Sequence, residues 1–137
     1  MLLNEFWRYP AVEAAGNFSV VVLCLILSMV IFEIVTKYKN WVEIKKGNVA
    51  VALATGGKIL GVCNIFRYSI EKHNSLVEMM GWGLIGFILL IFAYVLFEFM
   101  TPTFKVDEEI EKDNRSVGFI SFTISVGLSF VIGASIS

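Results

Sequence analysis

The sequence has few of the residues from which soluble enzymes and metalloproteins build their sites. It contains one histidine, His73, and two cysteines, which leaves no zinc or haem constellation. Eleven Lys and Arg residues stand against twelve Asp and Glu residues, so no basic surface for nucleic acid is expected. No nucleophile–base pair and no phosphate-binding loop is visible, so we expect neither an enzyme nor a bound cofactor or metal.

Charge is also scarce, at 17% of residues against 57% hydrophobic residues, and its placement decides the fold class. Four long stretches are mostly apolar, and apart from Glu78 at an edge their only charges are Glu33, Lys58 and Glu98. Runs of about 20 such residues match a hydrocarbon layer of about 30 Å. The sequence therefore predicts an all-α polytopic membrane protein with four transmembrane helices, at Phe18–Thr36, Val49–Phe66, Glu78–Phe99 and Ser116–Ile136.

The remaining segments divide the chain into three predicted parts. Residues 1–17 hold aromatic side chains among polar ones, which is typical of an interfacial arm, and the first apolar run after them is expected to stay as a membrane anchor. Residues 18–77 and 78–137 each hold two spans. The acidic connector Lys105–Arg115 is interpreted as a solvated linker, with binding of a basic partner or a divalent cation as the alternative. Cys24 and Cys63 are interpreted as buried apolar residues without a disulfide.

The two pairs of spans resemble each other. Val30–Thr36 (VIFEIVT) parallels Val95–Thr101 (VLFEFMT), and Glu43–Asn48 (EIKKGN) parallels Glu109–Asn114 (EIEKDN). A two-span hairpin returns the chain to its starting side, so both copies must insert in the same sense. The sequence thus predicts two parallel two-helix repeats.

Basic residues predict the orientation in a bacterial inner membrane. Seven Lys and Arg residues lie in the first and third connectors and three on the other side. The positive-inside rule then places connectors 37–47 and 101–115 in the cytoplasm and both termini outside. The seven are Lys37, Lys39, Lys45, Lys46, Lys105, Lys112 and Arg115, and the three are Arg8, Arg67 and Lys72.

One stretch carries a family resemblance. A span that ends in a glutamate, followed by WVEIKKGNVAVALATGGKILG at Trp41–Gly61, resembles the YjfL-like family of bacterial inner-membrane proteins. The likeness extends over nearly the whole chain and is most specific from Glu43 to Gly61. It implies small four-span proteins of unknown function, sometimes built of repeated two-span units and encoded near membrane-stress or polyamine-related proteins. It implies no catalytic residue.

The three intramembrane charges are the first candidate site. Lys58 lies near the middle of its span, where a charge costs at least about 2.5–3.5 kcal/mol on insertion scales. Glu33 and Glu98 occupy matching positions near one boundary, within reach of a long lysine side chain. We expect an intramembrane network of Glu33, Lys58 and Glu98 that binds a cation or relays protons. The alternatives are a structural ion pair and boundary carboxylates that reach the headgroups.

Two further sets of residues are expected to be mainly structural. Asn48 and Asn114 open the second and fourth spans, where asparagine caps a helix, although they could also line a vestibule with Asn64. Small residues at a spacing of four share one face of a helix and favour close helix packing, with a hydroxyl-lined polar path as the alternative. This packing set is Gly57, Gly61, Ser121, Ser125, Ser129 and Gly133.

Two classes of function remain open. The first is a small ion channel or transporter, expected to be a homo-oligomer because four spans are few to enclose a pathway alone. The second is a non-transporting membrane anchor or scaffold that recruits a cytoplasmic protein partner through connectors 37–47 and 101–115. Both interpretations share the lipid bilayer as the environment of the chain.

Overall fold

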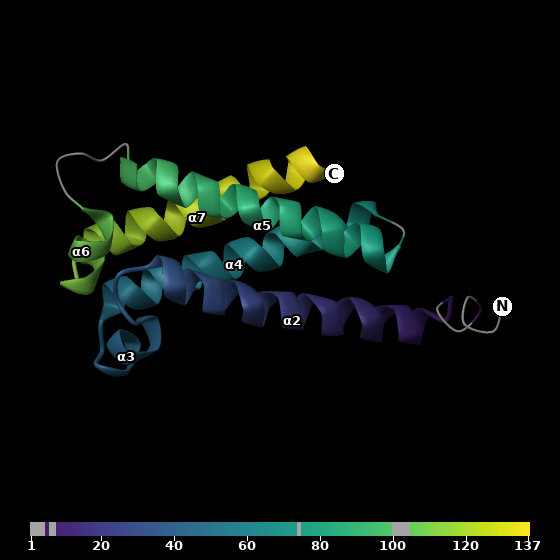
Figure 1. Cartoon of the computed structure of the whole chain (residues 1–137), viewed down its shortest axis with the longest axis horizontal. Helices are drawn as coiled ribbons and strands as arrows, with labels where there is room; N and C mark the ends of the chain where they lie inside the picture. Colours follow the sequence, from purple (N-terminus) through teal and green to yellow (C-terminus); the bar gives the residue numbers. More distant parts are fainter. Residues whose placement is uncertain (1–4, 6–7, 74, 100–104) are drawn as a thin grey trace.

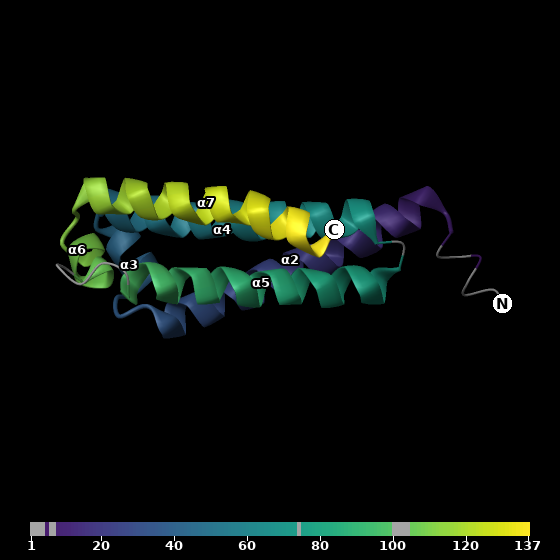
Figure 2. The ribbon, with the colours of Figure 1, turned by 90° about the horizontal axis from the view of Figure 1, so that it is seen from above.

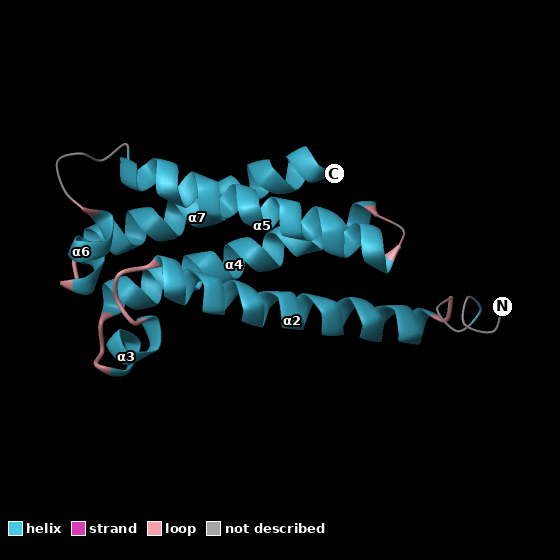
Figure 3. Ribbon diagram, viewed as in Figure 1, coloured by secondary structure: helices cyan, strands magenta, loops and turns pink. Residues whose placement is uncertain are grey.

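The computed structural model describes residues 5, 8–73, 75–99 and 105–137, with the side chains of residues 98 and 99 left out. Helices joined by short loops make up this part of the chain, which contains no strand (Figure 3). The helices are α2 (Pro10–Val35), α3 (Asn40–Lys45), α4 (Val49–Lys72), α5 (Leu76–Phe99), α6 (Val106–Glu111) and α7 (Arg115–Ile136).

Four of these helices are long and apolar enough to cross a membrane, namely α2, α4, α5 and α7. The predicted fold class, an all-α polytopic membrane protein, is therefore confirmed. The four spans differ in burial: 56% of the most apolar window of α4 is buried inside the molecule, against 17% of that of α2. Helix α4 is thus the central helix, and α2 turns most of its surface outward.

The long helices form a bundle in which α4 and α7 lie side by side and run in the same direction (Figures 1 and 2). Three hydrogen bonds establish this direction along the pair. The Ala50 N–H donates to Asp113 at one end, Asn64 donates to Ser129 in the middle, and His73 contacts the Ile136 carbonyl at the far end. A parallel α4–α7 pair is what two hairpins inserted in the same sense would give.

The short helices α3 and α6 of the two connectors lie at the same end of the bundle, and the start of α2 and the C-terminus lie at the other (Figure 1). The Lys37 N–H donates to the Asp107 carboxylate, and the Asn48 side chain donates to the Glu111 carbonyl. These bonds tie the first connector to the third. They agree with the expectation that both connectors face the same side of the membrane.

Helix α2 begins earlier than the first predicted span. It starts at Pro10, which occupies the first helical turn, and continues without a break to Val35. Proline suits that place because its missing N–H would have no partner in the helix and its φ is already helical. The second half of the predicted arm therefore extends the first span, while residues 1–4 and 6–7 lie outside the described part of the chain.

The connectors hold two short helices, α3 and α6, which no sequence pattern had indicated. Each short helix is followed by a left-handed residue, Gly47 (φ 88°) or Asp113 (φ 62°), and then by an asparagine that caps the next long helix. This match supports the predicted repeat, which stays a prediction. The interpretation of Lys105–Arg115 as a solvated linker was wrong for its central part, because Val106, Asp107 and Ile110 of α6 are buried.

The small residues of the predicted packing set lie where α4 meets α7. A Cβ atom on Gly57 would stand 2.7 Å from the Phe122 Cα, and one on Gly61 would stand 3.2 Å from the Ser125 carbonyl oxygen. The absence of side chains at Gly57 and Gly61 lets the two backbones approach closely, as membrane helices without a hydrophobic driving force require. Gly133 instead makes room for the Tyr68 ring.

Candidate functional site

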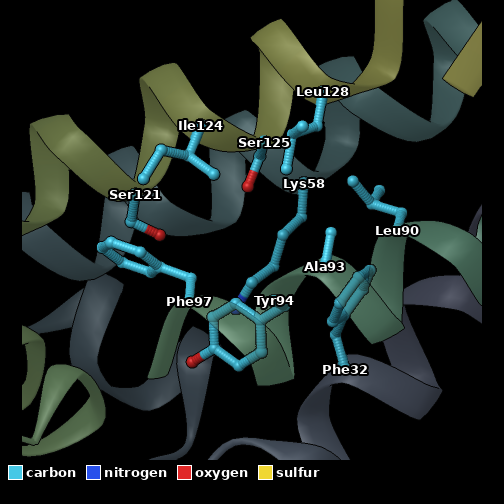
Figure 4. A pocket seen from close by; sticks show the side chains of 10 residues that line it. All are labelled: Phe32, Lys58, Leu90, Ala93, Tyr94, Phe97, Ser121, Ile124, Ser125 and Leu128. Atoms are coloured by element: carbon cyan, nitrogen blue, oxygen red, sulfur yellow. The ribbon is translucent and has the colours of Figure 1, made fainter. Parts of the chain in front are cut away.

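Lys58 lies in the middle of the bundle. Its side chain projects from α4 and is only 2% exposed. No other charged residue lies in the central turns of this helix. It borders a small cavity of about 10 Å³, enough for about one water molecule (Figure 4). The cavity is lined by Phe32, Lys58, Leu90, Ala93, Tyr94, Phe97, Ser121, Ile124, Ser125 and Leu128.

Two aromatic rings hold the ammonium group of Lys58. Its Nζ lies 4.6 Å from the ring centroid of Tyr94 on α5 and 5.1 Å from that of Phe32 on α2. Cation–π contacts at such distances contribute about 0.5–2 kcal/mol each, more when water is excluded. The rings therefore offset part of the cost of placing a charge at this depth, and they draw α2, α4 and α5 together around it.

A buried carboxylate lies behind Tyr94. The Tyr94 hydroxyl donates a hydrogen bond to Oδ1 of Asp107, and the Lys37 backbone N–H donates to Oδ2 at 3.2 Å. Asp107 is 2% exposed, although it belongs to the acidic connector. A chain of contacts thus runs from Lys58 through Tyr94 to Asp107 and the connector end of the molecule.

Hydroxyl groups of α7 border the other side of the cavity. The Ser121 and Ser125 hydroxyls both point toward its interior (Figure 4). Ser121 is 2% exposed, and its Oγ has no hydrogen-bond partner within the described residues. One turn beyond Ser125, the Ser129 hydroxyl accepts a hydrogen bond of 3.0 Å from Asn64. The serines thus serve close helix packing and also present a polar face to Lys58.

Glu33 is engaged elsewhere. Its carboxylate accepts hydrogen bonds from the backbone N–H of Asn40 (3.1 and 3.2 Å) and from the Asn40 side chain (2.7 Å). Asn40 in turn accepts from the Thr55 hydroxyl on α4. In the described part of the chain, Glu33 forms no ion pair with Lys58. The side chain of Glu98 lies outside the described residues, so the predicted network stays a prediction.

Asn48 and Asn114 act as helix caps. The Asn48 side chain accepts from the Val51 N–H at 3.0 Å, and that of Asn114 accepts from the Val117 N–H at 3.4 Å. Each also donates to the third connector, Asn48 to the Glu111 carbonyl and Asn114 to the Glu109 carboxylate. Both asparagines therefore join the ends of α4 and α7 to the turns around α6.

Sequence reasoning missed Tyr94 and Asp107. Tyr94 looks like one more aromatic residue in an apolar span, and Asp107 looks like one of several solvated acids. A usable signal is that Asp107 follows an apolar residue and precedes Ile110 at helical spacing, which places it on the inner face of a short amphipathic helix. No group of three His, Cys, Asp or Glu residues that could hold a metal ion occurs in the described ranges.

The bundle and its buried lysine define a multi-pass α-helical membrane protein with a polar centre. Residues 1–136 match the family described as Domain of Unknown Function (DUF350), and the chain belongs to this family. It is also 61% identical to the UPF0719 transmembrane protein YshE of Bacillus subtilis (strain 168) over 134 residues, which are 98% of this chain and 100% of the relative. No solved structure gives a significant match.

Proposed function

We propose that this chain is an integral membrane protein that relays protons across the bilayer through Lys58. The observation that carries the proposal is a lysine 2% exposed at mid-span, beside a cavity lined by serine hydroxyls and a tyrosine. An apolar residue there would avoid an insertion cost of about 2.5–3.5 kcal/mol, so stability alone does not favour lysine. Ionisable residues inside membrane proteins typically mark ion or proton pathways.

The size of the cavity favours protons over other ions. A volume of about 10 Å³ holds about one water molecule and no hydrated metal ion. Protons need no such space, since they pass between side chains and single water molecules. Polar groups that could take part lie on both sides of Lys58, with Tyr94 and Asp107 toward the connectors and Ser125, Ser129 and Asn64 toward the termini.

The assembly and setting of the protein are part of the proposal. The outward surface of α2 carries large apolar side chains such as Leu23, Leu27 and Ile34, which suit contact with lipid or with another copy. We propose a homo-oligomer in a bacterial inner membrane, with both connectors in the cytoplasm, in line with the basic residues of the connectors. The relationship to YjfL-like proteins belongs to the same proposal.

Proteoliposomes test the relay directly. Purified protein is reconstituted into potassium-loaded vesicles that contain a pH-sensitive dye, and valinomycin sets the membrane potential. We expect proton uptake that Lys58→Met abolishes. Lys39→Met, which removes an exposed lysine of the first connector, is the matched control and should retain the flux. Folding of both variants is checked by helix content and gel filtration. Equal flux in Lys58→Met and the unmodified protein would refute the proposal.

The scaffold function remains a second candidate, because the connector end exposes many charged side chains. Exposed Lys45 ends α3 and exposed Lys46 follows it, and exposed Glu108 and Glu111 lie on α6. A cytoplasmic protein of complementary charge could bind this surface. Crosslinking in intact cells, followed by purification, would favour it if one soluble protein is recovered with the unmodified chain and lost when both glutamates are replaced by Gln.

A further inference from the structure

We propose that Asp107 is the connector-side proton acceptor of Lys58 and that Tyr94 joins the two. This inference rests on the proposed function, because it names the route by which a proton leaves the buried lysine. Three facts carry it: the burial of Asp107, its hydrogen bond from the Tyr94 hydroxyl, and the position of Lys58 Nζ over the Tyr94 ring.

The burial of Asp107 sets it apart from its acidic neighbours. Glu108 and Glu111 of the same short helix are exposed, whereas Asp107 is 2% exposed and points into the bundle. Both of its carboxylate oxygens accept hydrogen bonds, one from the Tyr94 hydroxyl and one from the Lys37 N–H. A carboxylate enclosed in this way is held in one orientation, with its proton-accepting oxygen at the phenol.

Tyr94 spans the distance between Asp107 and Lys58. Its ring lies under the ammonium group, with 4.6 Å from Nζ to the ring centroid, and its hydroxyl lies at Asp107. The proposed transfer requires Nζ to move from the ring face to the phenol oxygen by rotation about the terminal bonds of the Lys58 side chain. The same residue therefore attracts the charged form of Lys58 through its ring and can transfer a proton through its oxygen.

The proposed transfer from Lys58 to Asp107 is a concerted movement of two protons through Tyr94. The phenol proton of Tyr94 moves to Oδ1 of Asp107, while the phenol oxygen takes a proton from the Lys58 ammonium. The products are a neutral lysine, a neutral carboxylic acid and an unchanged tyrosine, so no atom or charge is gained or lost. The protonated Asp107 then releases its proton toward the connector surface, where the neighbouring Lys37 is exposed.

Apolar packing surrounds the polar groups Tyr94 and Asp107 at the connector end of the bundle. A cluster of buried apolar residues fills the connector end of the bundle beside it, including Val51, Ala54, Val106 and Ile110. Water does not enter such a cluster readily. The hydrogen bond between Tyr94 and Asp107 passes this apolar region, so it offers a proton a way past packing that excludes solvent.

Two conservative variants test the route in the proteoliposome assay. Tyr94→Phe keeps the ring over Lys58 and removes only the hydroxyl, and Asp107→Asn keeps a hydrogen-bond acceptor that cannot take up the proton. Each is expected to lower the proton flux about a hundredfold or more, the contribution typical of a positioned proton-transfer group. Glu108→Gln, at the next and exposed position of α6, should leave the flux unchanged.

The outcomes separate this inference from the proposed function. One outcome is that the unmodified protein moves protons, that Lys58→Met abolishes the flux and that both conservative variants retain it. In that case the route through Tyr94 is overturned, whereas the relay through Lys58 stands. If the unmodified protein moves no protons, both fall. Infrared difference spectroscopy adds a second readout, an acid-dependent C=O band of a protonated carboxylic acid. Disappearance of this band in Asp107→Asn supports the route, and persistence of the band contradicts the route. If Asp107→Asn does not fold, Tyr94→Phe decides alone.

Discussion

The contact between α4 and α7 allows a matched pair of substitutions at adjacent glycines. Gly57 and Gly56 are neighbours inside α4, so replacement by alanine gives both the same gain in helix propensity, about 1 kcal/mol. Their surroundings differ. A Cβ on Gly57 would stand 2.7 Å from the Phe122 Cα and 3.1 Å from its carbonyl oxygen, whereas a Cβ on Gly56 meets nothing within 4 Å.

The size of the expected difference follows from these distances. Carbon atoms pack best at about 3.5–4.0 Å, so Gly57→Ala requires α7 to move away by about 1 Å. Because the neighbouring atoms belong to backbone, no side-chain rotation can relieve the contact. Overpacking of this kind costs about 1–3 kcal/mol, and since the propensity gain is shared, the two variants should differ in unfolding free energy by about that amount. Gly57→Ala is the less stable variant.

Reversible unfolding in mixed micelles, with a denaturing detergent as the titrant and helix content as the signal, measures both free energies under one condition. Agreement of the two variants within about 0.5 kcal/mol, the usual size of surface effects, would refute the claim that Gly57 permits a close backbone approach. Gly57→Ser extends the test, because a serine adds a further atom at the same place and should destabilise the protein more than alanine does.

Three further predictions follow from the connector end. Asn48→Ala should lower the unfolding free energy by about 1–2 kcal/mol. Asn114→Ala should lower it less, because the capping hydrogen bond of Asn114 is longer (3.4 against 3.0 Å). Equal decreases in unfolding free energy in the same titration would contradict this reasoning. Single cysteines at Lys39 and Lys112, in a chain without Cys24 and Cys63, should react with an impermeant maleimide from the same side of the membrane; labelling from opposite sides would exclude the arrangement of the connectors described above. Glu33→Gln should leave the proton flux near its original value while weakening the hold on Asn40, and a loss as large as that of Lys58→Met would place Glu33 in the relay.

Most of the fold could be predicted from the sequence because membrane spans are defined by length and polarity. Three of the predicted spans lie within the observed long helices, and the first extends one residue beyond the end of α2, to Thr36. The boundaries agree exactly at Val49, Phe99 and Ile136 and differ elsewhere. The caps at Asn48 and Asn114 were also predictable, since capping depends on a side chain and a backbone three residues apart. Such local signals need no knowledge of tertiary contacts.

The candidate site could be predicted only in part, because its partners come from distant segments. The depth of Lys58 in its span marked it as a site residue, but Tyr94 and Asp107 reach it through the packing of α5 and α6. The burial of an acidic residue in a connector depends on which face of a six-residue helix turns inward, and composition does not show this. The engagement of Glu33 by Asn40 likewise depends on the fold of the first connector.

The position of the site explains why two similar halves would have to differ. Counted from the capping asparagines Asn48 and Asn114, Lys58 and Ile124 occupy the same place, and both line the cavity. The first predicted repeat supplies Lys58 and the Phe32 ring, while the second supplies Tyr94 and Asp107. A second lysine at Ile124 would place two like charges at one small cavity, where repulsion and desolvation act together. Lys58 thus has ring contacts from both predicted repeats, and this gives a physical reason for a four-helix chain with one central lysine.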